Sequence, residues 1–156
     1  IQMEMNTDGW PRAWINAVYQ AVEDGLQSGV IKGYPVQGVR VRVLGMQRLQ
    51  DASSEVGYHM AAGSALKKAL SQARPLLMEP IMLVEMVAPE EFVGDVVSLI
   101  GSKGGKIENM YDRGGGKVVQ ALAPLRHLFG FSTELRSVSQ GRGNFIMRFE
   151  RFDVLD

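Results

Sequence analysis

The order of strand and helix patterns in the second half of the chain constrains its fold more than any other feature. Four runs have the alternation or the apolar content of β-strands, at residues 81–88, 107–112, 117–123 and 144–152. Apolar residues recur at helical spacing over 89–100, and a second helical segment covers 124–137. The resulting order is strand, helix, strand, strand, helix, strand.

This order predicts a ferredoxin-like βαββαβ sandwich for the second half. Pro89 supports the first helix, because proline is favoured in a first helical turn. Glu90 and Glu91 then place two carboxylates at the positive end of the helix dipole. Ser132 is predicted to cap the second helix, which we expect to be interrupted at Gly130.

The first half has a helix, a strand and a helix after a short strand-like start. Apolar spacing predicts helices over 11–28 and 55–70, and the strict alternation of valine and arginine predicts a half-buried strand over 39–44. The chain opens with Ile1 rather than methionine, in what reads as the end of a strand. We therefore expect an incomplete α/β domain whose N-terminal partner strands are missing.

The segment between the halves contains two prolines that interrupt the helical pattern, Pro75 and Pro80. We place a domain boundary there. The sequence thus predicts an α+β protein of two small domains, the first over residues 1–75 and the second over residues 78–156.

The composition limits the functions open to the chain. Its 156 residues include 17 basic and 17 acidic side chains, so the formal net charge is zero and nucleic-acid binding must come from local patches. There is no cysteine, which excludes disulfides and thiolate metal sites. The apolar runs fall far short of the roughly 20 residues that a membrane helix needs. We expect a cytoplasmic protein with no membrane partner.

The stretch from Ile100 to Ile107 has the I-G-x-x-G-x-x-I pattern of a KH domain, whose glycine loop clamps single-stranded nucleic acid. A KH domain needs a helix after this loop. Three glycines at 114–116 would stop such a helix about ten residues after the loop. We therefore predict a turn from helix to strand, with Gly101 or Gly104 in the left-handed conformation.

The sequence also lacks the residues that define a phosphate-binding loop, a metal site or a catalytic site. Neither glycine-rich stretch has the G-x-x-x-x-G-K-[ST] spacing of a phosphate loop, so we expect this chain not to bind GTP. His59 and His127 lie in different halves with no second ligand near either, so no metal site is predicted. No nucleophile, base and orienting group come together, so we predict no catalytic residue and no enzyme activity for this chain.

Several short motifs in the second half follow one another in the order and spacing of a known family. They are Glu79-Pro80, Pro89-Glu90-Glu91, Gly94-Asp95-Val96, Pro124-Leu125, Phe129-Gly130-Phe131, Leu135-Arg136-Ser137 and Gln140-Gly141-Arg142-Gly143. With these motifs, the second half resembles domain V, the C-terminal domain, of bacterial elongation factor G. Segments 17–36 and 53–70 resemble most of domain IV of the same family.

The resemblance implies a role on the ribosome. In that family, a GTP-hydrolysing domain lies far upstream and uses GTP and magnesium, so we expect a C-terminal fragment with no cofactor of its own. Domain IV reaches the decoding region and helps to move tRNA and mRNA. Domain V docks near the GTPase-associated ribosomal RNA and its stalk-base protein. The resemblance therefore implies the ribosome-engaging part of a translational GTPase that promotes translocation, with no small-molecule substrate.

The resemblance also suggests which residues contact the ribosome. The loop from Gly45 to Ala52, the tip loop, falls at the tip of domain IV, where elongation factors often carry a histidine. The matching position here is Leu49. Arginine can donate several hydrogen bonds to phosphate and leucine none, so we expect Arg48 to be the contact, and neither residue to affect stability. The candidate ribosome- or RNA-binding residues are Met46, Gln47, Arg48, Leu49, Gln50, Lys103, Lys106, Arg136 and Arg142.

Two alternatives stay open at this point. The first alternative is a paralogue specialised in ribosome recycling or ribosomal protection, since such proteins share both domains and differ at the tip of domain IV. An alternative of another class is a free-standing ferredoxin-like domain that binds a small molecule. The segment Ser28–Val36 argues against the latter, because nothing in such a domain requires it.

Overall fold

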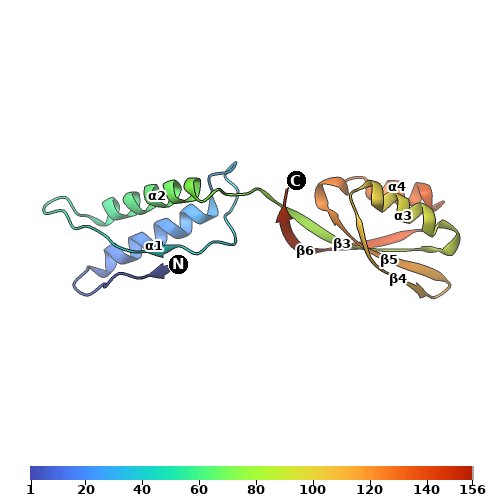
Figure 1. Cartoon of the computed structure of the whole chain (residues 1–156), viewed down its shortest axis with the longest axis horizontal. Helices are drawn as coiled ribbons and strands as arrows, with labels where there is room; N and C mark the ends of the chain where they lie inside the picture. Colours follow the sequence, from blue (N-terminus) through green and yellow to red (C-terminus); the bar gives the residue numbers. More distant parts are fainter. Residues whose placement is uncertain (156) are drawn as a thin grey trace. The chain divides into compact units, whose positions relative to one another are not determined.

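The computed structural model describes residues 1–155, which form two compact units (Figure 1). The first unit spans Ile1–Pro75, and the second begins at Leu76. No helix within the described residues is both long enough and apolar enough to cross a bilayer.

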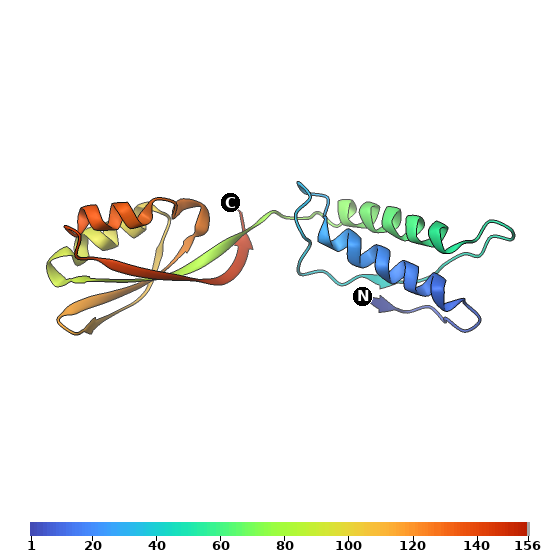
Figure 2. The ribbon, with the colours of Figure 1, turned by 180° about the vertical axis from the view of Figure 1, so that it is seen from behind.

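The first unit is built on two helices, α1 (Arg12–Gln27) and α2 (Glu55–Gln72), which lie side by side (Figures 1 and 2). Pro11 precedes α1 directly. The Ser54 side chain caps α2, because its Oγ accepts a hydrogen bond of 3.0 Å from the Gly57 N–H. Both helices predicted for the first half are confirmed, and α2 runs two residues beyond the predicted end.

The interior between these helices is small and apolar. Its buried residues are Val22, Leu66 and Leu70, with Leu26, Val30, Val36 and Val41 packed around them. On α1, Ala17, Val18 and Ala21 are also buried. Because these side chains are small, α2 can approach α1 closely. The close approach allows a small number of apolar residues to hold the two helices together.

The predicted strand over 39–44 is only partly formed. The structure has a two-residue strand β2 (Arg42–Val43), which pairs in parallel with β1 (Gln2–Met3). Val39 is 47% exposed, so the alternating valines do not all face the interior. The prediction was wrong at residues 39–41 and at Leu44, because the ladder with β1 has only two residue pairs, at Arg42 and Val43.

An ion pair strengthens this short ladder. The Arg42 guanidinium donates two hydrogen bonds, of 2.8 and 2.9 Å, to the two carboxylate oxygens of Glu4. The hydrogen bonding, together with the attraction between the charges, raises the pKa of Arg42 above its ordinary value. The Glu4 N–H also donates to the Val43 carbonyl at 3.0 Å, so backbone and side chain hold the same two segments together.

The second unit is a four-stranded sheet covered on one face by two helices (Figures 1 and 2). Its elements are β3 (Met78–Pro89), α3 (Val93–Ser102), β4 (Lys106–Arg113), β5 (Gly116–Pro124), α4 (Phe131–Val138) and β6 (Asn144–Val154). The strand order is β4-β5-β3-β6, and every neighbouring pair is antiparallel. This is the α+β, ferredoxin-like βαββαβ fold predicted from the order of patterns.

The core of this unit lies between the sheet and its helices. Alternate residues of β3 and β5 face the helices because a strand turns successive side chains to opposite faces. The buried cluster comprises Val84, Met86, Ala88, Val96, Ile100, Val119, Ala121, Ala123, Leu128, Phe131 and Leu135. Phe131 of α4 meets Phe145 of β6 edge to face, with ring centres 5.0 Å apart.

Two helix boundaries differ from the predictions. A 3₁₀ helix (Glu90–Phe92) comes between β3 and α3, so the acidic pair lies in this short helix rather than in the first turn of α3. The segment predicted as helical over 124–137 begins with a second 3₁₀ helix (Leu125–His127), and α4 starts at Phe131, after the interruption that was predicted at Gly130. The predicted cap at Ser132 was wrong. Gly130 holds the cap position with φ of +80°, a conformation that glycine adopts at little cost.

Candidate nucleic-acid interface

The tip loop, Gly45–Ala52, is held in place by two side chains that follow it. The Ser53 hydroxyl accepts from the Leu49 N–H at 2.9 Å and lies 3.0 Å from the Leu49 carbonyl, to which it can donate. The Tyr58 hydroxyl donates to the Gln47 carbonyl at 2.8 Å. These bonds connect the loop to the first turn of α2, so the backbone of the tip has a defined shape.

Arg48 holds the other side of the tip loop. Its guanidinium carbon lies 4.9 Å from the centre of the Trp10 ring and 5.3 Å from that of Trp14. Its Nη2 donates to the Gly9 carbonyl at 2.9 Å. Trp14 in turn contacts Tyr58, with ring centres 5.0 Å apart. Arg48 is therefore part of the structure of the tip, and the expectation that its replacement leaves stability unchanged is revised.

The other predicted tip residues have different surroundings. Leu49 is 62% exposed, and Gln47 and Gln50 are also exposed. Met46 is half-buried and lines an apolar hollow of about 510 Å³ between the segment 41–47 and the two helices. Gln47, Leu49 and Gln50 are thus the predicted side chains that the tip loop presents to solvent without a hydrogen-bond partner among the described residues.

The glycine-rich stretch that has the KH sequence pattern forms the end of a helix. Gly104, two residues after the end of α3, has φ of +71°, as predicted for one of the two glycines. The Gly105 N–H donates to the Ile100 carbonyl at 2.9 Å. A Cβ atom on Gly105 would lie 2.6 Å from that carbonyl oxygen, so the turn requires glycine there. The chain then enters β4 at Lys106 rather than a second helix, which contradicts a KH module.

The two lysines of this turn differ in what they can bind. Lys103 Nζ lies 2.7 Å from Glu134 Oε1, and its side chain is only 20% exposed. The Lys103 carbonyl lies 3.0 Å from Nδ1 of His127, which connects the turn to the segment before α4. Lys106 is exposed. The turn therefore presents Lys106 as its accessible cation, while Lys103 is neutralised by an acidic neighbour.

The two predicted arginines also differ. Arg142 pairs with the carboxylate of Glu91 and lies over the Phe92 ring, with 5.8 Å from its guanidinium carbon to the ring centre. Arg136, on α4, is exposed, and no ion pair is formed by its side chain within residues 1–155. The structure thus places Lys106 and Arg136 as the predicted cations of the second unit that are available to phosphate.

Sequence reasoning missed the aromatic residues beneath the tip loop. Trp10, Trp14 and Tyr58 form a contiguous group, with Trp10 and Tyr58 ring centres 5.9 Å apart. The usable signal was the position of Trp10 just before the helix start and of Trp14 in its first turn, where apolar residues on either side of a helix start often pack together. Their contact with Arg48 could not be predicted from the sequence, because it depends on the conformation of a loop without regular secondary structure.

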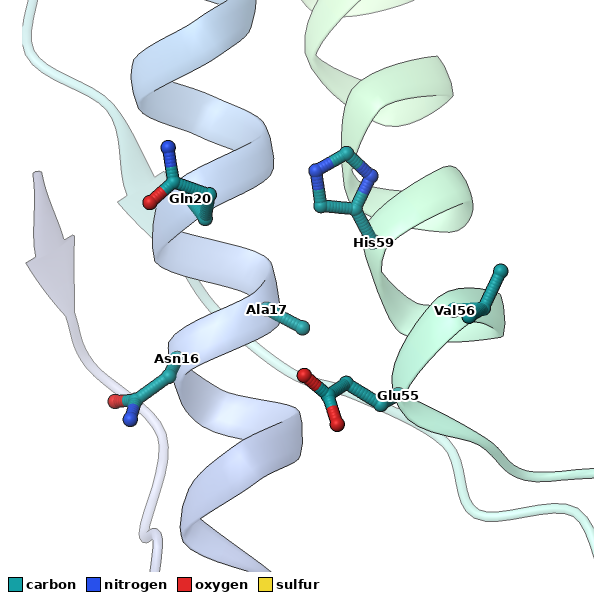
Figure 3. Close-up of a pocket in the computed structure, with 6 residues that line it drawn as sticks. All are labelled: Asn16, Ala17, Gln20, Glu55, Val56 and His59. Carbon is teal, nitrogen blue, oxygen red and sulfur yellow. The ribbon is translucent and has the colours of Figure 1, made fainter.

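A second hollow, lined by both polar and apolar side chains, lies between α1 and α2 (Figure 3). It has a volume of about 410 Å³ and is lined by Asn16, Ala17, Gln20, Glu55, Val56 and His59. His59 Nε2 lies 3.7 Å from Asp24 Oδ2, and the Gln20 side chain donates to Asp24 Oδ1 at 2.9 Å. Within residues 1–155, no group of three or more histidine, cysteine or acidic side chains is arranged to hold a metal ion.

Comparison with family models divides the chain in the same way as its fold. Residues 3–74 match the model described as elongation factor G, domain IV. Residues 76–156 match the model described as elongation factor G C-terminus. Together the two matches cover nearly the whole chain in an unbroken order.

Comparison with solved structures gives a match over almost the full length. A crystal structure of a protein from Thermus thermophilus is similar to this chain with a TM-score of 0.86 and 29% sequence identity. The match covers 99% of this chain and 24% of the Thermus chain. The chain therefore spans about a quarter of the length of this solved relative.

Proposed function

Because the chain belongs to the elongation factor G family, we propose that it is the ribosome-engaging C-terminal part of a translational GTPase that promotes movement of tRNA and mRNA. The observation that carries this proposal is the consecutive match to the family's domain IV and C-terminal models. The ribosome is the partner that this pair of domains implies. The protein acts in the cytoplasm, and a separate domain supplies the GTP and magnesium chemistry.

In the first unit, the tip loop approaches the tRNA and mRNA of the decoding region. Its backbone is fixed by Ser53 and Tyr58, and its exposed residues Leu49 and Gln50 lie at the surface. Arg48 has further N–H donors beyond the one given to Gly9, so it can contact a phosphate while it holds the loop. A loop of fixed shape suits a step in which RNA is displaced rather than read by sequence.

The second unit docks on ribosomal RNA near the stalk base. Lys106 and Arg136 supply positive charge there, whereas Lys103 and Arg142 are already paired with Glu134 and Glu91. Contacts of this kind reach phosphates and carry no base preference. RNA binding by the chain is therefore weak, dependent on salt and indifferent to sequence.

One observation favours a second candidate, a paralogue that works in ribosome recycling or ribosomal protection. Elongation factors often have a histidine at the tip position that Leu49 occupies here. A leucine cannot donate a hydrogen bond to RNA. The histidine lies in the part of the family's tip loop that approaches the tRNA. Its replacement by Leu49 therefore favours a role other than movement of tRNA.

A graft separates the two candidates. Residues 1–156 replace the corresponding residues of a full-length elongation factor G, and single-turnover translocation and ribosomal subunit splitting are both measured. The proposed function predicts translocation well above the rate without factor. Splitting without translocation would support the recycling candidate instead, and failure of both reactions with a correctly folded graft would contradict the proposal.

A further inference from the structure

The Arg48 side chain is fixed by contacts within the first unit and is still exposed. Its guanidinium carbon lies over the rings of Trp10 and Trp14, and its Nη2 donates to the Gly9 carbonyl. The residue is nevertheless exposed. A Cβ atom added to Gly9 would have no neighbour within 4 Å, so the space next to this glycine is open. A flat, charged group is therefore held in place while part of its surface faces solvent.

The backbone that carries Arg48 also has a fixed shape. The tip loop lies at the end of the first unit at which α1 and α2 begin (Figure 1). On one side of Arg48, the Gln47 carbonyl accepts from the Tyr58 hydroxyl, and on the other side the Leu49 N–H donates to the Ser53 hydroxyl. A group that is already ordered loses little conformational freedom when a ligand binds to it. Arg48 is thus preorganised for contact.

The charge of the tip gives little attraction to a phosphate. The tip loop contains one cation, Arg48, and one carboxylate, Asp51, so its formal charge is zero. A second exposed carboxylate, that of Asp8, directly precedes the glycine to which Arg48 donates. Attraction to the phosphates of a nucleic acid needs an excess of positive charge, and this surface has none.

The tip instead combines the groups that bind a nucleobase. Unpaired RNA bases stack on aromatic rings and on arginine guanidinium planes. Leu49 is 62% exposed and adds apolar surface next to Arg48 in the loop. The exposed side chains of Gln47 and Gln50 have both donors and acceptors for the edge of a base. A base carries no charge, so the neighbouring carboxylates do not repel it.

We propose that the exposed side of the Arg48 guanidinium stacks on one unpaired base of single-stranded RNA, while Trp10 and Trp14 hold the guanidinium from beneath. The proposal rests on the proposed function, in which the tip loop meets RNA. It deepens that function by naming a base, rather than a phosphate, as the ligand of the tip. The contact has no sequence preference of its own, because every base has a π face.

Two RNAs of equal charge isolate the contribution of the bases. The 156-residue chain is titrated with a short labelled oligoadenylate and with an abasic strand of the same length, and fluorescence anisotropy gives both affinities. We expect the oligoadenylate to bind roughly fivefold or more tightly than the abasic strand. This ratio should persist as salt rises, because both strands release the same counterions.

Tryptophan fluorescence reports where the base binds without any substitution. The only two tryptophans in the sequence are Trp10 and Trp14, and both lie against Arg48. Oligoadenylate is expected to change their emission in a saturable way, with the same midpoint as the anisotropy titration. The abasic strand is expected to leave the emission unchanged.

The variant Arg48→Lys separates stacking from charge. Lysine keeps the positive charge but has no flat group on which a base can stack. We expect the affinity for oligoadenylate to fall to that for the abasic strand, whereas the affinity for the abasic strand stays the same. Arg40→Lys, at an exposed arginine of the same unit, is the matched control and should change neither affinity. Circular dichroism verifies that both variants are folded.

The source of the base is found with a second pair of RNAs. A linear strand represents mRNA, and a hairpin with an unpaired loop, compared with the same hairpin with an abasic loop, represents tRNA. Base-dependent binding of either supports the proposal, and the larger ratio identifies the source.

Three results overturn the proposal: equal affinity of the wild type for strands with and without bases, undiminished binding of oligoadenylate by folded Arg48→Lys, or no binding of any strand at any concentration. These results leave the graft experiment unaffected. A graft that translocates while the chain shows no base-dependent binding supports the proposed function and contradicts only the stacking contact.

Discussion

The guanidinium of Arg48 lies over the ring of Trp10, with its central carbon 4.9 Å from the ring centre. This contact joins the tip loop to the segment that leads into α1. A cation over an aromatic face is attracted by the ring electrons, and the exposed loop gains a fixed attachment that its sequence does not indicate. Arg48 therefore combines a structural contact with donors left free for RNA.

Replacement of Arg48 by alanine is expected to destabilise the first unit by about 1 kcal/mol, through loss of the aromatic contacts and of the bond to Gly9. Leu49→Ala is the matched control, and its effect is expected to stay within about 0.5 kcal/mol because Leu49 is exposed. The chain has two tryptophans, both beneath the tip loop, so their fluorescence during urea unfolding reports on this unit. Equal effects of the two substitutions would contradict the structural role of Arg48.

Replacement of Tyr58 by phenylalanine removes the hydroxyl that donates to the Gln47 carbonyl while it keeps the ring against Trp14. We therefore expect the tip loop to become more mobile, whereas the helices of the first unit should be unaffected. Hydrogen exchange measured by mass spectrometry is expected to accelerate over residues 46–50 and to remain unchanged over α1. Uniform acceleration across the first unit would show that the ring itself was disturbed.

The glycine turn after α3 provides a paired test of its structural role. Gly105→Ala is expected to destabilise the second unit by about 1–3 kcal/mol, because its Cβ atom would meet the Ile100 carbonyl oxygen. At Gly101, which lies inside α3, nothing is within 4 Å of an added Cβ atom, so alanine should stabilise the helix by up to about 1 kcal/mol. Urea unfolding followed by far-ultraviolet circular dichroism measures both. Equal stability of the two variants would refute this account of the turn.

The two units are expected to differ in resistance to proteolysis. The first unit has a small apolar interior and only two-residue strands, whereas the second has a four-stranded sheet over an extended buried cluster. Local opening is easier where few apolar contacts must break. Limited trypsin digestion should therefore cut within residues 1–75 first. An initial cut at Arg113, in the hairpin between β4 and β5, would contradict this order.

The second unit was predictable from sequence because each of its elements has a strong local signal. Alternation over 81–88 and 144–152, the helical spacing before Ile100 and the hairpin glycines all agree with one topology. The strand over 39–44 failed for a related reason. Its alternation is equally regular, but a strand needs a neighbour, and the ladder with β1 pairs only Arg42 and Val43.

The candidate interface was harder to predict than the fold. Sequence indicated a loop with an arginine and a turn with two lysines, but not which of these cations would be neutralised. Glu134 lies 31 positions beyond Lys103 and Glu91 lies 51 positions before Arg142, so both pairings depend on the tertiary structure. Only the folded chain distinguishes the paired Lys103 from the exposed Lys106.

Co-sedimentation of the chain with bacterial ribosomes shows whether these two domains engage the ribosome. The chain is incubated with ribosomes at increasing salt concentrations, and full-length elongation factor G serves as competitor. We expect saturable binding that weakens as salt rises and is displaced by the competitor, because the contacts are to phosphates. Absence of ribosome binding at low salt, together with saturable binding of a small metabolite, would contradict it.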